Sequence, residues 1–143
     1  MRIHDILHTK GSDVVVIEPT ASVRDLVTLL RDHNLGALVV SSDGATVEGI
    51  VSERDVIRAL ADGVEFIDGP VTDIMTPVVH TCTPEDHVQS LMATMTEARV
   101  RHIPVLDGHS RLSGIVSIGD VVKSTIDQLQ FERDQLDSYV HRT

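Results

Sequence analysis

An internal repeat constrains the fold of this chain more than any other feature of its sequence. Residues 49–55 (GIVSERD) and 114–120 (GIVSIGD) share glycine, serine and aspartate at an offset of 65. Nearer the N-terminus the offset becomes 68, where residues 5–7 correspond to 73–75, so the first copy carries extra residues around 9–13. The offset of 65 also aligns Pro19 with Pro84, Val23 with Val88, Leu26 with Leu91, Val27 with Met92 and Leu30 with Met95. The chain is therefore predicted to contain two copies of one structural unit.

Within each copy, apolar periodicity predicts the order strand, helix, strand, strand, helix. Apolar residues from Val23 to Leu30 recur at helical spacing, and Ser22 with Asp25 matches a capping box; Thr83 is the expected cap in the second copy. Glycine-containing turns are expected at 43–44 and 107–108. The expected strands are 14–17, 36–40, 47–51, 78–82, 101–106 and 112–116, and the expected helices run to about 30, from 52 to 61, to about 98 and onward from the second corner.

The repeat also predicts the domain boundaries. The first unit covers 1–62, an acidic linker covers 63–70, the second unit covers 71–126 and a helical extension covers 127–143. Units of about 60 residues are marginal alone, so the two are expected to pack together. The extension carries Val122, Ile126, Leu129, Leu136 and Val140 in a heptad pattern that one Arg interrupts. Two interpretations stay open: the helix packs on its own domain, or it contacts a second subunit.

Composition excludes several classes of function. A formal net charge of -10 disfavours nonspecific binding to nucleic acid or anionic lipid, and one Tyr, two Phe and no Trp leave little for base stacking. No apolar run approaches the roughly 18 residues of a membrane span, and no secretory signal is recognised, so a soluble, cytoplasmic protein is expected. Cys82 is the single cysteine and is expected to be a buried apolar residue.

The two Ser-x-x-Asp corners support two interpretations. Ser52 with Asp55 and Ser117 with Asp120 fit a capping box at the start of a helix. A helix N-terminus also attracts phosphate, and a carboxylate beside it accepts hydrogen bonds from a ribose diol. The doubled corner therefore indicates a pair of nucleotide sites.

These residues resemble a known family. The doubled GIVSxxD, the RHIPV of residues 101–105 and the repeat over residues 1–126 are similar to paired CBS (cystathionine-beta-synthase) domains, which form a Bateman module. The resemblance implies an α+β fold of two β-α-β-β-α units related by pseudo-twofold symmetry. It also implies adenosine ligands such as AMP, ADP, ATP, NAD(H) or S-adenosylmethionine, and a homodimer of two modules.

The family motif implies that Asp55 and Asp120 hold ribose hydroxyls, with Ser52 and Ser117 near the phosphates. The start of the second strand of each unit is expected to line a cleft, and Arg101 can bind phosphate in a bidentate manner. Because Arg54 corresponds to Gly119, we expect two inequivalent sites, the stronger one using Asp120 and Arg101. The ten candidate ligand-binding residues are Gly36, Ala37, Ser52, Arg54, Asp55, Arg101, His102, Ser117, Gly119 and Asp120. No catalytic residue or metal ligand is predicted, because nucleophile-elbow, Walker, G-x-G-x-x-G and paired zinc-ligand patterns are absent from the sequence.

The sequence therefore predicts a regulatory adenosine-nucleotide sensor that signals to a separate effector protein. The alternative is a scaffold or redox-partner regulator whose nucleotide clefts are vestigial, as resemblance to plant stand-alone CBS pairs allows. An enzyme that turns over ATP or NAD is a third hypothesis.

Overall fold

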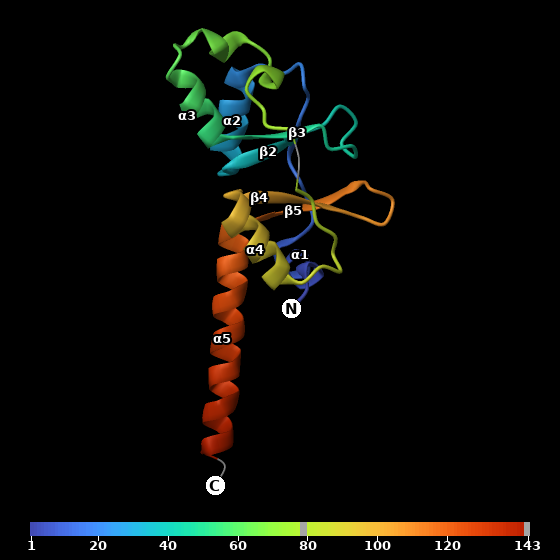
Figure 1. Ribbon diagram of the computed structural model, residues 1–143, viewed down its shortest axis with the longest axis vertical. Coiled ribbons are helices and arrows are strands. Elements are labelled where there is room, and N and C mark those ends of the chain that lie inside the picture. The colour runs from blue at the N-terminus through green and yellow to red at the C-terminus, as the bar shows by residue number, and fades with distance from the viewer. Residues whose placement is uncertain (78–79, 142–143) are drawn as a thin grey trace.

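The computed structural model describes residues 1–77 and 80–141 and has an α+β fold. Figure 1 shows two small sheets facing each other across the middle of the molecule, with helices on their outer sides. The first sheet holds β1 (Val16–Ile17), β2 (Ala37–Val40) and β3 (Gly49–Ser52), and the second holds β4 (His102–Leu106) and β5 (Leu112–Ser117). The predicted fold class is confirmed.

Strand pairing repeats between the two units. β1 runs parallel to β2 with Ile17 opposite Val40, and β2 runs antiparallel to β3. β4 and β5 are antiparallel, and Cys82 forms an isolated parallel bridge with Val105, at the positions equivalent to Ile17 and Val40. The strand predicted over 78–82 falls partly on residues 78 and 79, which lie outside the described residues.

The helices confirm most of the periodicity and correct one cap. In α2, Ser22 accepts the backbone N–H of Asp25 at 3.0 Å, as predicted. The cap predicted at Thr83 is wrong: its N–H donates to Asp86 at 2.9 Å within a turn, and the helix begins only after His87, the equivalent of Ser22. The helical elements are α1 (Ile3–Lys10), α2 (Val23–His33), α3 (Glu53–Leu60), α4 (Val88–Ala98), α5 (Ile118–Val140) and the 3-10 turns η1 (Glu65–Asp68) and η2 (Val71–Asp73).

The two units exchange the segments that precede them. Ile3 and Leu7 of α1 are buried in the core of the second unit, beside Val88 and Ile103. In return, Val71 of η2 is buried in the core of the first unit, with Ile74 and Met75 packed against it. The predicted boundaries divide the chain by its order in sequence. The cores do not follow that division, because α1 packs in the second core and η2 packs in the first.

Backbone hydrogen bonds and glycine contacts hold both exchanged segments in equivalent ways. The N–H of Val88 donates to the carbonyl of Met1, and the N–H of Val23 donates to the carbonyl of Gly69, both at 3.0 Å. A Cβ at Gly114 would lie 2.7 Å from Leu7, and one at Gly49 would lie 2.7 Å from Met75. The small residue in each strand therefore admits a large apolar side chain from the exchanged segment.

The last helix leaves the body of the protein. Its first turns contact α1 and α4, but from Ile126 onward every described residue of α5 is exposed. Figure 1 shows this end of α5 projecting away from both sheets. Within residues 1–77 and 80–141, no helix combines the length and the apolar character needed to cross a bilayer.

Candidate functional site

Both Ser-x-x-Asp corners form capping boxes. At the start of α3, the N–H of Ser52 donates to Oδ2 of Asp55 at 2.8 Å, and the N–H of Asp55 donates to the Ser52 hydroxyl at 3.3 Å. At the start of α5, the corresponding distances between Ser117 and Asp120 are 2.8 and 3.1 Å. The capping role is therefore present at both corners, and each aspartate is held with one oxygen turned to the cap.

A cleft of about 830 Å³ opens at the first corner. The first unit contributes the start of α3, and the second unit contributes the end of α4 and the start of β4. Thr76, on the edge of the first sheet, donates its hydroxyl to Oδ1 of Asp55 at 3.2 Å. Six of the ten predicted residues line this cleft: Gly36, Ser52, Arg54, Asp55, Arg101 and His102.

The other four predicted residues do not line this cleft. Ala37 is buried in β2, and Ser117, Gly119 and Asp120 lie at the second corner. There, Oδ2 of Asp120 is paired with Nζ of Lys10 at 2.5 Å. Burial by itself would raise the pKa of Asp120, but hydrogen bonds from Lys10 and Ser117 outweigh it and hold that pKa below its usual value.

Arg101 and Asp120, which were predicted to serve one site, are not both in the lining of this cleft. Arg101 lines the cleft that contains Asp55, because facing sheets bring the start of β4 across to the corner of the first unit. Arg101 thus lines the cleft of the first corner, while its carbonyl accepts the N–H of Ile118 at the second corner at 2.8 Å.

His102 lies where the two units meet. A Cβ at Gly36 would lie 3.3 Å from Oε1 of Glu53 and 3.5 Å from the His102 ring, so the glycine leaves room for both side chains. Burial lowers the pKa of His102, the positive charge of Lys10 lowers it further, and Asp120 and Glu53 partly oppose this. The lowered pKa favours the neutral ring, which can donate one hydrogen bond and accept another.

Two arginines that line the cleft were not predicted from the sequence. Arg58 lies one helical turn after Arg54, and Arg99 ends α4 with a left-handed backbone, φ 55°. The spacing of four residues on α3 was a usable signal for Arg58. Arg99 carried no such signal, because only the contact between units brings the end of α4 to α3.

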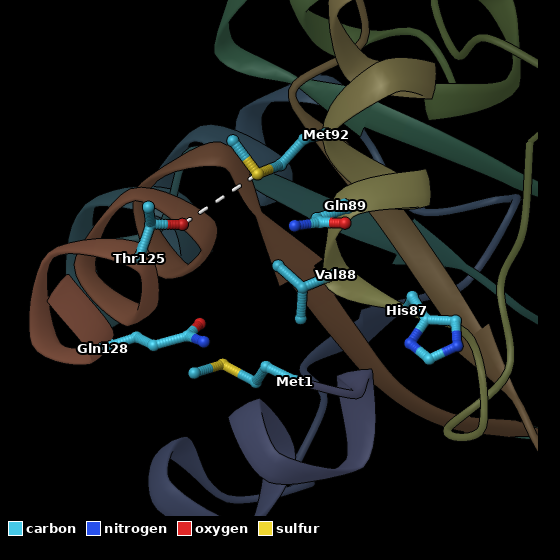
Figure 2. Close-up of a pocket in the computed structure, with 7 residues that line it drawn as sticks. All are labelled: Met1, His87, Val88, Gln89, Met92, Thr125 and Gln128. Carbon is cyan, nitrogen blue, oxygen red and sulfur yellow. Dashed lines mark hydrogen bonds between the residues drawn. The ribbon is translucent and has the colours of Figure 1, made fainter. Parts of the chain in front are cut away.

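A second cavity, of about 270 Å³, lies between α4, α5 and the N-terminus. Figure 2 shows Met1, Val88 and Met92 around it, with Thr125 and Gln128 on the α5 side. Of the residues that the structure describes, none of the ten predicted ones and no arginine line it. This cavity therefore lacks the guanidinium groups that line the larger cleft. Among the described residues, no group of three or more His, Cys, Asp or Glu is placed to hold a metal ion.

Comparisons with known proteins match both halves of the chain. The profile of the CBS domain matches residues 3–62 and 71–127. A CBS-domain protein of Agrobacterium tumefaciens has a structure with 39% sequence identity and a TM-score of 0.83, covering 87% of this chain and 99% of that one. A CBS domain protein of Pyrobaculum aerophilum, solved in complex with AMP, has 28% identity and a TM-score of 0.75, covering 84% of this chain and 89% of that one. A mitochondrial CBS domain-containing protein of Arabidopsis thaliana is 35% identical over 147 residues, 96% of this chain and 71% of the relative.

Proposed function

Since the chain belongs to the CBS domain family and carries two such domains, we propose that it is a regulatory module that binds an adenosine nucleotide in the Asp55 cleft. One observation carries this proposal: Asp55 of the first unit and Arg101 of the second line the same cleft. A carboxylate can accept hydrogen bonds from a ribose diol, and a guanidinium group can donate them to a phosphate. The Pyrobaculum relative in complex with AMP supports the ligand class.

The lining of the cleft suits the three parts of such a ligand. Ile50, Ile57 and Val100 offer apolar surface to a purine base. Oδ1 of Asp55, which accepts from Thr76, has a further lone pair for a ribose hydroxyl. Arg101 provides a planar pair of donors for a phosphate.

Regulation follows from the shared lining. A ligand that contacts α3 of the first unit and β4 of the second stabilises one arrangement of the two units over others. A separate effector protein that distinguishes these arrangements would then sense the nucleotide. In this proposal the protein catalyses no reaction, and its location is cytoplasmic.

We propose that two copies form a homodimer along the exposed part of α5. Ile126, Leu129 and Leu136 are 49%, 60% and 64% exposed and lie along one heptad seam. A parallel pair would set Arg133 against its own copy and Glu132 near Asp137 of the partner subunit, which are like charges. An antiparallel pair instead sets Lys123 near Asp137 of the partner subunit. This antiparallel register also sets Glu132 near its own copy, but it alone adds opposite-charge contacts, Lys123 with Asp137 at both ends, and we therefore favour it.

Native mass spectrometry of protein purified without added nucleotide tests the ligand class, because a retained adenosine compound would be identified by its mass. A thermal-shift screen with adenosine, AMP, ADP, ATP, NAD and S-adenosylmethionine complements it, since a ligand at about 100 times its Kd stabilises the fold by about 2.7 kcal/mol. If no adenosine compound is retained or stabilises the protein, the nucleotide proposal fails, and the alternative of a scaffold or redox-partner regulator with vestigial clefts takes its place.

A further inference from the structure

The Asp55 cleft concentrates positive charge in a strongly acidic chain. Four arginines line it, whereas the whole chain has 12 Lys and Arg against 22 Asp and Glu. Among the described residues that line the same space, two are acidic, Glu53 and Asp55. The four arginines are Arg54 and Arg58 on α3, Arg99 at the end of α4 and Arg101 before β4.

These four guanidinium groups are available to a ligand. Ion pairs of arginine occur elsewhere in the described part of the chain, at Arg24, Arg31 and Arg133. Within that same part, no hydrogen bond or ion pair engages the side chains of the four cleft arginines. Four exposed arginines against two acidic residues leave the cleft with a positive balance of charge, which attracts an anion.

The repeat provides an internal comparison for this cluster. At an offset of 65, the four arginines correspond to Gly119, Lys123, Asn34 and Gly36. The equivalent positions of the other unit therefore hold a single cation in place of four. The fold itself does not require the arginines, because the other copy of the unit forms without them.

Arg99 shows most clearly that the fold does not require an arginine at these positions. It adopts the left-handed conformation with φ 55°, and its equivalent, Asn34, adopts it with φ 52°. Asparagine is among the residues that tolerate this conformation best, and arginine is not. Arginine at this position therefore favours a role for its side chain in the cleft.

We infer that the Asp55 cleft selects an adenosine ligand carrying two or more linked phosphates over AMP or an uncharged adenosine compound. A monophosphate engages one or two guanidinium groups, whereas a diphosphate or triphosphate chain has enough oxygens for arginines on both sides of the cleft. This inference rests on the proposed adenosine-binding function and specifies the ligand of that site.

Calorimetry on the full chain in magnesium-free buffer tests the selection, with adenosine, AMP, ADP, ATP and inorganic pyrophosphate as probes. We expect ADP and ATP to bind at least about tenfold more tightly than AMP, as each added charge-assisted hydrogen bond allows. Arg99→Asn, which copies the residue of the other unit, and Arg58→Gln should each weaken ADP and ATP binding about tenfold and leave adenosine binding within about twofold.

Arg111→Gln is the matched control, because Arg111 is exposed in the β4–β5 turn and does not line the cleft. AMP binding as tight as ADP and ATP binding would overturn the selection and leave the proposed adenosine function standing. Equal losses for adenosine and ATP in Arg99→Asn would overturn it too. Binding of pyrophosphate alone, or of none of the probes, would overturn both proposals.

Discussion

Lys10 and Asp120 form an ion pair that joins the N-terminal helix to the corner of the second unit. Nζ of Lys10 lies 2.5 Å from Oδ2 of Asp120 and 2.7 Å from the carbonyl oxygen of Ile115. The corresponding aspartate, Asp55, receives a neutral hydroxyl from Thr76 instead. The two corners therefore differ in charge as well as in sequence.

Removing this ion pair should lower stability at neutral pH. The pKa of Asp120 is lowered in the folded state, so its contribution is present above the unfolded value of about 3.9 and is lost as the pH falls through the folded value. We expect Lys10→Met to be less stable than the wild type by about 0.5–1 kcal/mol at pH 7, with a smaller difference at about pH 3, below the unfolded pKa of Asp120. Urea unfolding at both pH values measures this, with Arg31→Gln as the surface control. A constant difference at both pH values would contradict it.

The two aspartates should differ in their effect on ligand binding. Asp55 lines the cleft and Asp120 does not, although both cap helices in the same way. We expect Asp55→Asn to weaken ADP binding at least about tenfold and Asp120→Asn to weaken it far less, although Asp120→Asn costs more stability because it loses the ion pair with Lys10 as well as about 1 kcal/mol of capping. Calorimetry gives the affinities and thermal unfolding gives the losses of stability. Equal losses of affinity would remove the distinction between the corners.

A methyl group at Gly114 should be destabilising. Its Cβ would meet the buried side chain of Leu7 at 2.7 Å, whereas a Cβ at Gly108 would meet nothing within 4 Å. We expect Gly114→Ala to lower the free energy of unfolding by about 1–3 kcal/mol, the usual range for overpacking. Gly108→Ala is the control and should change it by less than about 0.5 kcal/mol. Chemical denaturation distinguishes them, and similar effects from both would show that α1 yields without loss.

Reversing one charge on α5 should weaken the proposed dimer, and reversing its predicted partner should restore it. In the antiparallel pair, Lys123→Glu places two acids together, and adding Asp137→Lys recovers opposite charges. In a parallel pair these positions are about 21 Å apart along the helix axis, so no recovery is expected. Sedimentation equilibrium at low salt follows the change. Gln128→Glu, outside the seam, is the control, and a monomer for the wild type at micromolar concentration would rule out the dimer.

The thiol of Cys82 should be unreactive in the native protein. Burial raises its pKa to about 12, with Asp86 adding to the effect, so very little thiolate exists at pH 8. We expect a thiol reagent to react rapidly only after denaturation. Rapid reaction of the native protein would show that the bridge between Cys82 and Val105 opens readily.

The repeat predicted the strands and helices well because both copies carry the same apolar pattern and turns. The corner Ser52–Asp55 was predictable from local chemistry, since a capping box involves only four consecutive residues. The start of α4 was not predictable in this way. His87 is the N-cap there, but histidine is not among the residues preferred at that position, and its side chain makes no capping hydrogen bond.

The composition of the cleft could be predicted only within each unit. Gly36, Ser52, Arg54 and Asp55 come from the first unit and line the cleft, whereas Ala37, predicted beside them, is buried in β2. The contribution of Arg101 and Arg99 depends on how the two sheets face each other, and a sequence repeat does not contain that information. The same reason explains why the exchange of α1 and η2 between the cores was not foreseen.

That exchange has a consequence for the order in which the chain can fold on the ribosome. The first core is complete once Met75 has emerged, because η2 follows directly after the unit it serves. α1 is made first, yet Val88 and Val116, against which it packs, are made much later. Domains generally fold in order from the N-terminus during synthesis. α1 is therefore expected to remain undocked while the first core forms, because the second core cannot be completed before Val121 has emerged.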